Sequence, residues 1–317
     1  MVQFKRKHLW MTAIIVTCLI FGGTAIAAEK IRFASVSWTG VTVKTELGVN
    51  ILNSLGYDAS FIMVSVPIVY KALSMGEADI FLGNWMPSMA NIASQFFEDG
   101  SVIKYVASMP NAKYTLAVPR YVYEGGLKDF SDIAKYADKL ESKIYGIEEG
   151  NDGNEVIQKM IDENMFGLGD FELIPSSEVA MLSQVQSFMK QDQWIVFLGW
   201  SPHYMNEIID MKYLTGSTAE TFGENDGTAT VYTNIRKGFD KDQPNIARFL
   251  LNYKFPISMM NQIMAMLYEN ENLTTEQAGL TWIKKHPDIY KGWLEGIQTV
   301  DGKPALDAFE KYLATVE

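Results

Sequence analysis

Four aromatic residues stand near the ends or starts of segments that we expect to be β-strands, where open α/β sheets bind ligands: Trp38, Trp85, Tyr114 and Trp200. A quaternary ammonium has no N–H to donate, so cation–π attraction and dispersion against ring faces are what can bind it. Each desolvated ring contributes about 0.5–2 kcal/mol, and micromolar affinity requires about 8 kcal/mol. The four residues therefore fit an aromatic cage, while core packing and a cleft that stacks sugar rings stay open as alternatives.

Groups suited to catalysis are scarce in this sequence. Its three histidines are His8, His203 and His286, and we find no zinc-protease, P-loop, dinucleotide-binding or Gly-x-Ser-x-Gly spacing. His203 has no nucleophile beside it in sequence, so we interpret it as a structural, hydrogen-bonded histidine. Glu148 and Glu149 are adjacent and point apart, which makes a weak acid/base pair. We predict a protein that is not an enzyme and that needs no metal or cofactor.

The N-terminus has the pattern of a secretory signal. A basic head at residues 5–7 precedes an apolar stretch, residues 9–23, and small residues near Ala27 and Ala28 suit a signal peptidase. Residues 1–28 are therefore predicted to be a cleaved signal peptide, which implies a periplasmic protein. The only cysteine, Cys18, lies in this stretch, so the mature chain would have no thiol.

The charge balance excludes some partners. Removing the three basic residues at positions 5–7 changes the formal net charge from −11 to −14. An acidic protein of this kind is a poor ligand for nucleic acid and for anionic membranes. We expect a soluble monomer.

The elements that must position the rings alternate between strand and helix, which favours a sheet covered by helices on both faces. The segment 80–86 is expected to begin as a buried strand, to break at Gly83 and to present Trp85 before a helix that Pro87 opens. Further strands are predicted at residues 31–36, 59–64, 113–119, 143–147, 171–174, 194–200 and 229–235. Helices are predicted at residues 41–55, from 67, and at 131–140, 156–164, 178–190, 243–251, 257–268, 274–285 and 289–296. Their local signals include a C-cap at Gly56, an N-cap at Ser176–Ser177 and a capping box of Thr274 and Gln277.

Long segments of the chain resemble the substrate-binding proteins of ABC transporters for glycine betaine, carnitine and choline, and the choline-binding branch above all. The segments are SWTGVTVKTELG, VSVPIVYKALSMGEADIFLGNWMP, KYTLAVPRYV, GIEEGNDGN and FLGWSPHYMN. The resemblance implies a two-lobed periplasmic binding protein fold of type II, with a mixed sheet flanked by helices in each lobe and two crossover segments at a hinge. Lobe 1 would comprise residues 29–112 and 222–317, and lobe 2 residues 113–221.

The resemblance also implies roles for particular residues. Trp38, Trp85, Tyr114 and Trp200 match the box around the trimethylammonium group, and Asn151 matches an asparagine that contacts the polar end of the ligand. Two positions depart from the choline-binding branch, which has W-T-D where this chain has Gly40 and often an acidic residue where it has Ser201. The loss of carboxylates disfavours a bare cation and removes repulsion against a ligand carboxylate.

The predicted function is capture of a quaternary ammonium compound (glycine betaine, choline or carnitine) between two lobes and its delivery to the membrane permease of an ABC transporter. Alternatives are a receptor for another small solute, such as a sugar or an amino acid, a ligand-sensing subunit, and a secreted hydrolase. No arginine lies in the expected cleft segments, which counts against an amino-acid receptor.

Overall fold

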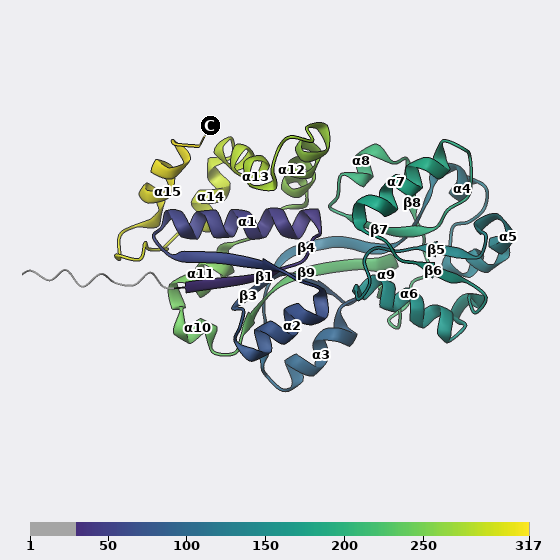
Figure 1. Ribbon diagram of the computed structural model, residues 1–317, viewed down its shortest axis with the longest axis horizontal. Helices are drawn as coiled ribbons and strands as arrows, with labels where there is room; N and C mark the ends of the chain where they lie inside the picture. The colour runs from purple at the N-terminus through teal and green to yellow at the C-terminus, as the bar shows by residue number, and fades with distance from the viewer. Residues whose placement is uncertain (1–29, 317) are drawn as a thin grey trace, which may run out of the picture.

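The computed structural model describes residues 30–316, and the predicted signal peptide, with His8 and Cys18, lies outside them. A mixed sheet extends through the molecule in the order β2-β1-β3-β9-β4-β7-β5-β6, and β8 also pairs with β4. Helices cover both faces of this sheet (Figure 1), so the predicted α/β class with mixed strand directions is confirmed. The strands are β1 (Lys30–Ser35), β2 (Asp58–Met63), β3 (Ile80–Met86), β4 (Val102–Pro119), β5 (Lys143–Tyr145), β6 (Glu172–Ile174), β7 (Phe197–Ser201), β8 (Met211–Tyr213) and β9 (Thr228–Arg236).

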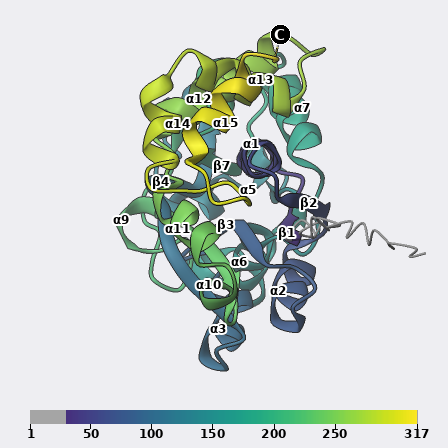
Figure 2. The same cartoon turned by 90° about the vertical axis from the view of Figure 1, so that its left-hand side faces the viewer.

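The helices fall into two groups along the chain. Those that pack around the β1–β3 end of the sheet are α1 (Thr39–Ser54), α2 (Val66–Met75), α3 (Ala90–Glu98), α10 (Phe239–Asp242), α11 (Pro244–Asn252), α12 (Ile257–Glu269), α13 (Thr275–Lys284), α14 (Pro287–Trp293) and α15 (Ala305–Leu313). Those from the middle of the chain are α4 (Arg120–Glu124), η1 (Phe130–Tyr136), α5 (Ala137–Leu140), α6 (Asp152–Asp162), η2 (Met165–Gly167), α7 (Glu178–Met189), α8 (Met205–Ile208) and α9 (Glu224–Gly227). Figure 2 shows the first group end-on, with α1 covered by α12, α13 and α15 on one side of the sheet and α2 and α3 on the other.

Two long antiparallel strands, β4 and β9, connect the two groups of elements (Figure 1). β4 pairs with β9 from Val102 to Lys113, and from Lys113 onward it pairs with β7. Lys113 is therefore the residue at which β4 leaves one group and enters the other. The lobe boundaries at 112/113 and 221/222 stay a prediction, and the structure adds that hydrogen-bonded strands rather than loose linkers pass between the groups.

Local sequence signals place several helix ends as predicted. Pro67 lies in the first turn of α2, and Gly56 has the positive φ of 91° that follows many helix C-termini. Ser177 accepts a hydrogen bond from the backbone N–H of Ala180 and so caps α7. The capping box of Thr274 and Gln277 is present at the start of α13.

Other elements differ from prediction. The strand expected to start at Lys113 starts at Val102, because the polar residues between obscure an alternation that three register shifts also interrupt. The helix expected at residues 131–140 is a 3₁₀ helix followed by one short α-helical turn. The strand expected from Trp194 begins at Phe197, and α15 was not predicted. Within residues 30–316, no helix has both the length and the hydropathy that a bilayer span requires.

Candidate functional site

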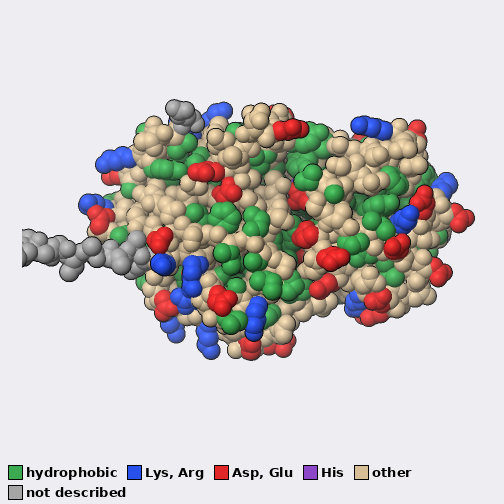
Figure 3. All heavy atoms as spheres, viewed as in Figure 1, with side chains coloured by type: hydrophobic (Ala, Val, Ile, Leu, Met, Phe, Trp, Pro, Cys, Tyr) green, Lys and Arg blue, Asp and Glu red, His purple; other side chains and the backbone are tan. Residues whose placement is uncertain are grey.

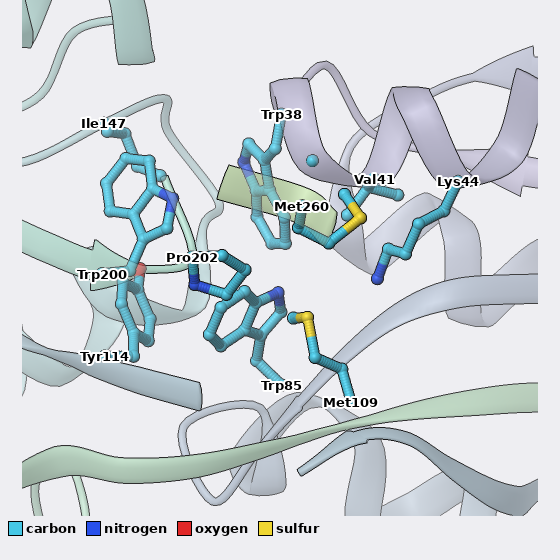
Figure 4. Close-up of a pocket in the computed structure, with 11 residues that line it drawn as sticks. Trp38, Val41, Lys44, Trp85, Met109, Tyr114, Ile147, Trp200, Pro202 and Met260 are labelled. Atoms are coloured by element: carbon cyan, nitrogen blue, oxygen red, sulfur yellow. The ribbon is translucent and has the colours of Figure 1, made fainter. Parts of the chain in front are cut away.

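A pocket lies where the two groups of elements meet, with about 480 Å³ of empty space, part of which is open to solvent (Figure 4). It brings together all four predicted ring residues and Gly40. Its lining consists of Trp38, Gly40, Val41, Lys44, Trp85, Met109, Tyr114, Ile147, Trp200, Pro202 and Met260. Apart from one lysine, these side chains are aromatic or apolar, so the space suits a methylated cation better than a strongly hydrated one.

Three of the four rings lie in a row against one another, and the Trp38 ring lines the same pocket. The centroids of Trp85 and Tyr114 are 5.8 Å apart, and those of Tyr114 and Trp200 are 6.2 Å apart at an interplanar angle of 79°. Each of the four side chains is between 6% and 8% exposed. The rings are therefore nearly desolvated yet still border an open space, as a cage for a cation requires.

Trp85 reaches the pocket from an irregular strand. We predicted that β3 breaks at Gly83, but the strand continues to Met86 with a register shift against β9 between Phe81 and Asn84. A bulge of this kind inserts residues without ending the strand. A larger residue does not fit at Gly83, because a Cβ there would lie 2.8 Å from the ring of Phe81 and 2.9 Å from Val41.

Pro87 also differs from prediction, since it does not open the next helix. A turn follows it, and α3 begins only at Ala90. Trp85 and Trp200 each stand two residues before a proline with a cis peptide bond, Pro87 and Pro202.

Tyr114 is fixed through its hydroxyl group by the start of α6. The hydroxyl donates a hydrogen bond to Asn151 Oδ1 over 3.2 Å. Gly153 lies directly behind it, where a Cβ would come within 2.1 Å of the tyrosine Oη. Burial, with the nearby Asp152 carboxylate, holds the pKa of Tyr114 well above its usual range, so the hydroxyl keeps its proton.

Asn151 is completely buried and is not among the residues that line the pocket. It is the N-cap of α6, since its Oδ1 accepts the backbone N–H of Asn154 over 3.0 Å. The first turn of α6, with Asp152 and Asn154, therefore follows the cap, although the sequence alone favours Asp152 and Asn154 as the caps. The Asn154 amide instead bonds the backbone N–H and C=O of Ile147, a pocket residue, over 3.0 Å and 2.7 Å. Direct contact between Asn151 and a ligand stays a prediction.

Trp38 and Thr39, at the start of α1, bind two carboxylates from the other group of elements. The indole Nε1 of Trp38 donates to Glu148 Oε1 over 2.5 Å, and the hydroxyl of Thr39 donates to Glu178 Oε1 over 2.5 Å. Burial raises the pKa of Glu148. Neither partner can be predicted from the sequence, because Glu148 lies 110 residues from Trp38 and Glu178 lies 139 residues from Thr39.

His203 is completely buried and completes the second of these contacts. Its Nε2 lies 2.9 Å from Glu178 Oε1, and its Nδ1 accepts the backbone N–H of Met205 over 3.1 Å. Burial by itself raises the pKa of Glu178, but the interaction with His203 and the hydrogen bonds from Thr39 more than offset this and lower it. Both ring nitrogens of His203 therefore have structural partners, as the sequence predicted.

Two further charged groups lie near or behind the rings. Asp152, in the first turn of α6, is 1% exposed, and burial raises its pKa to about 7. Lys44, on α1, is also 1% exposed and lines the pocket. Sequence reasoning missed Lys44, although it follows Val41 by three positions and so shares a helix face with it. In the part of the chain from residue 30 to 316, no cluster of three or more histidine, aspartate or glutamate side chains could hold a metal ion.

A comparison with protein families matches residues 29–285 to the substrate-binding domain of ABC-type glycine betaine transport systems. Among curated proteins, the glycine betaine/carnitine transport binding protein of Listeria monocytogenes is 30% identical over 165 residues. That alignment covers 52% of this chain and 53% of the Listeria protein.

Two solved structures cover 90% of this chain and 98% of their own at 42% identity. One is an ABC-transporter choline binding protein in complex with choline, with a TM-score of 0.87. The other is an ABC-transporter choline binding protein in an unliganded semi-closed conformation, with a TM-score of 0.81.

Proposed function

The chain belongs to the family of substrate-binding domains of ABC-type glycine betaine transport systems, and we propose that it binds the cationic head of its ligand among Trp38, Trp85, Tyr114 and Trp200. The observation that supports this proposal is the convergence of four nearly buried rings, from distant parts of the chain, on one apolar pocket. Their faces supply the cation–π attraction that a group without N–H donors needs.

The proposal includes closure of two lobes over the ligand. Trp38 and Trp85 come from the β1–β3 end of the sheet, whereas Tyr114 and Trp200 pair with each other on β4 and β7. A ligand among these rings touches both sides at once and therefore stabilises the closed arrangement. The two carboxylate contacts at the start of α1 join the same two sides.

We further propose that glycine betaine or a related betaine binds at least as well as choline. The pocket has Gly40 where the choline-binding branch has an aspartate, and Ser201 follows Trp200. Fewer carboxylates at the pocket weaken the preference for a bare cation and reduce repulsion of a carboxylate on the ligand.

Proteins of this family act outside the cytoplasm. For this chain we propose the periplasm as location, a membrane permease of an ABC transporter as partner, and delivery of the ligand without chemical change. A sensing role in place of transport would use the same pocket, so a neighbouring permease or ATPase gene separates the two.

A thermal-shift screen of the mature chain tests the proposal, because a ligand that binds only the native state raises the melting temperature. Choline, glycine betaine, carnitine, proline betaine and acetylcholine should raise it in a concentration-dependent manner, whereas glucose and alanine should not. Stabilisation by a sugar or an ordinary amino acid, with none by any quaternary ammonium compound, would contradict the proposed function. A response to choline without one to betaines would contradict the proposed preference.

A further inference from the structure

Lys44 places a cationic group in the pocket, at the end opposite Tyr114 and Trp200 (Figure 4). Its side chain is 1% exposed and extends from α1. In the view of Figure 4, Met109 and Met260 lie next to Lys44, and Trp38 and Trp85 lie between these methionines and the rings of Tyr114 and Trp200. The pocket therefore has an aromatic end, an apolar middle and a single ammonium at the other end.

The ammonium of Lys44 has no anionic partner among the described residues. Its Nζ donates to the backbone oxygen of Leu82 over 2.6 Å and lies 5.5 Å from the centroid of the Phe255 ring. Within residues 30–316, none of the ion pairs includes this lysine. An ammonium has three N–H donors, and a buried charge without a counter-ion is costly, so the site favours an anion supplied from outside.

The hydrogen bond to Leu82 also gives Lys44 a structural role in supporting β3. Leu82 and Gly83 lie in the bulge of β3, where neither has a paired residue in β1 or β9. The Lys44 ammonium therefore binds the carbonyl of a residue that has no partner in the strand register. A neutral amide could do the same without a charge, so this role alone does not account for an ammonium in a pocket built for a cation.

We propose that Lys44, rather than Asn151 as the resemblance implies, receives the anionic end of the ligand, and that the quaternary ammonium and the carboxylate of a zwitterion lie at opposite ends of the pocket. This inference rests on the proposed function of the four rings and deepens it by assigning the residue that distinguishes zwitterions from simple cations. A bare cation would be repelled by the lysine, whereas a carboxylate would neutralise it. Val41, Met109 and Met260 line the middle, where methylene groups fit, and methionine side chains adapt to spacers of different length.

The charge state of Lys44 supports this assignment. Burial lowers its pKa to about 7, so the free protein holds the lysine only partly protonated near neutral pH. A carboxylate beside it favours the protonated form. Binding of a zwitterion at pH 8 should therefore be coupled to proton uptake, whereas binding of choline should not be.

The test is calorimetry on the mature chain with tetramethylammonium, choline and glycine betaine, for the wild type and for Lys44→Gln and Lys44→Met. Gln can still donate to the Leu82 oxygen, and Met keeps the volume without a donor. Both variants should lose at least tenfold in affinity for glycine betaine, while tetramethylammonium and choline should bind as before or more tightly. An equal loss for all three ligands, or no loss for glycine betaine, overturns the proposal and leaves Lys44 as a support for β3.

Two further results keep the outcome unambiguous. Glycine betaine titrations of the wild type at pH 8, in buffers of different ionisation enthalpy, should show proton uptake that choline and the Gln variant lack, and its absence overturns the proposal even if the variants misfold. Other titratable groups lie nearby: the carboxylates of Asp152, Glu148 and Glu178 near the rings, and Tyr253, whose hydroxyl bonds the Lys44 backbone oxygen. Proton uptake with glycine betaine but not with choline assigns the proton to Lys44 rather than to these groups.

If no quaternary ammonium binds the wild type, the ring cage itself is wrong. If tetramethylammonium binds but the Lys44 substitutions do not change the preference between glycine betaine and choline, only the assignment of Lys44 to the anionic end of the ligand is wrong.

Discussion

The indole N–H of Trp38 donates a 2.5 Å hydrogen bond to Glu148, which lies in the loop between β5 and α6. This bond orients one ring of the pocket from the opposite side of the cleft. Thr39, the next residue, contacts Glu178 through both its hydroxyl and its backbone N–H. Carboxylates at the N-terminus of α1 also interact favourably with the helix dipole. The start of α1 is therefore both a wall of the pocket and a junction between the two sides.

Replacing Glu148 with alanine should weaken ligand binding by about 1–3 kcal/mol, because the Trp38 N–H would lose its acceptor in a largely buried place. Glu148→Gln keeps an acceptor oxygen and should have a smaller effect. Calorimetry of both variants, beside Glu149→Ala at the exposed neighbouring position, measures this. Equal affinities for the Glu148 and Glu149 alanine variants would show that the contact does not orient the ring.

Trp85→Ala and Trp200→Ala should each reduce affinity by about 1–3 kcal/mol without unfolding the protein, as expected for the loss of a desolvated ring contact. The matched control is Trp194→Ala. Trp194 packs against Tyr136, at a centroid distance of 4.8 Å, and does not line the pocket. Isothermal titration gives the affinity, and circular dichroism checks folding. Unaltered affinity in both pocket variants would mean that these rings only pack the core.

Gly153→Ala should weaken binding by displacing Tyr114, since the added Cβ would come within 2.1 Å of its hydroxyl oxygen. Alanine is otherwise a better helix former than glycine, so α6 itself should not be harmed. Gly292→Ala on α14, where a Cβ has no neighbour within 4 Å among the described atoms, is the control. Tyr114→Phe, which removes the hydroxyl, should restore part of the affinity in the Gly153→Ala background; no restoration would point to a different cause.

Gly40→Asp should raise the affinity for choline relative to glycine betaine by several-fold, because a carboxylate near the cage favours a bare cation. The position has room, since a Cβ would lie 3.6 Å from Met264 Sδ and 3.8 Å from Met260 Cε. An acidic residue in the first turn of α1 is also compatible with the helix. Gly40→Asn controls for size. An unchanged ratio of the two affinities would remove Gly40 from the determinants of ligand choice.

The contribution of Asp152 to the stability of the ligand-free protein should fall as pH rises from about 4 to about 7, because Asp152 is protonated in the folded state up to a pKa of about 7 but ionises near 4 when unfolded. Below pH 4 both states hold the proton, so the contribution is fully present there and is lost through the folded pKa. Asp152→Asn should flatten this part of the melting-temperature profile, whereas Asp170→Asn at an exposed position should not. Parallel profiles for all three proteins would contradict the assignment.

The sequence predicts the four aromatic residues of the pocket better than it predicts the contacts that hold their rings in place. Tryptophans that follow buried strands are visible as a local pattern, and the structure brings Trp38, Trp85 and Trp200 to one pocket as expected. The contact between Trp38 and Glu148 spans 110 residues, and nothing local indicates it. From the sequence, Glu148 is only half of a weak acid/base pair with Glu149, because its neighbours in sequence say little about a partner across the cleft.

Backbone geometry explains the other features that the sequence alone does not reveal. The bulge in β3 follows from the close packing of Gly83 against α1, which a strand pattern does not reveal. Asn151 is a cap and a support for Tyr114 because α6 starts four residues earlier than predicted, while its contact with a ligand stays a prediction. Lys44 resembles any solvent-facing helix lysine until the neighbouring strand is in place.

The bulge in β3 has a consequence for transplanting this site into another protein. The Leu82 carbonyl, which accepts a hydrogen bond from Lys44, lies in this bulge, and Trp85 follows the bulge on the same strand. Copying the four rings onto a regular sheet would reproduce a receptor for a methylated head group alone. A graft that also distinguishes zwitterions from simple cations must include the main-chain irregularity, because on our proposal part of the selectivity is encoded in the path of the backbone.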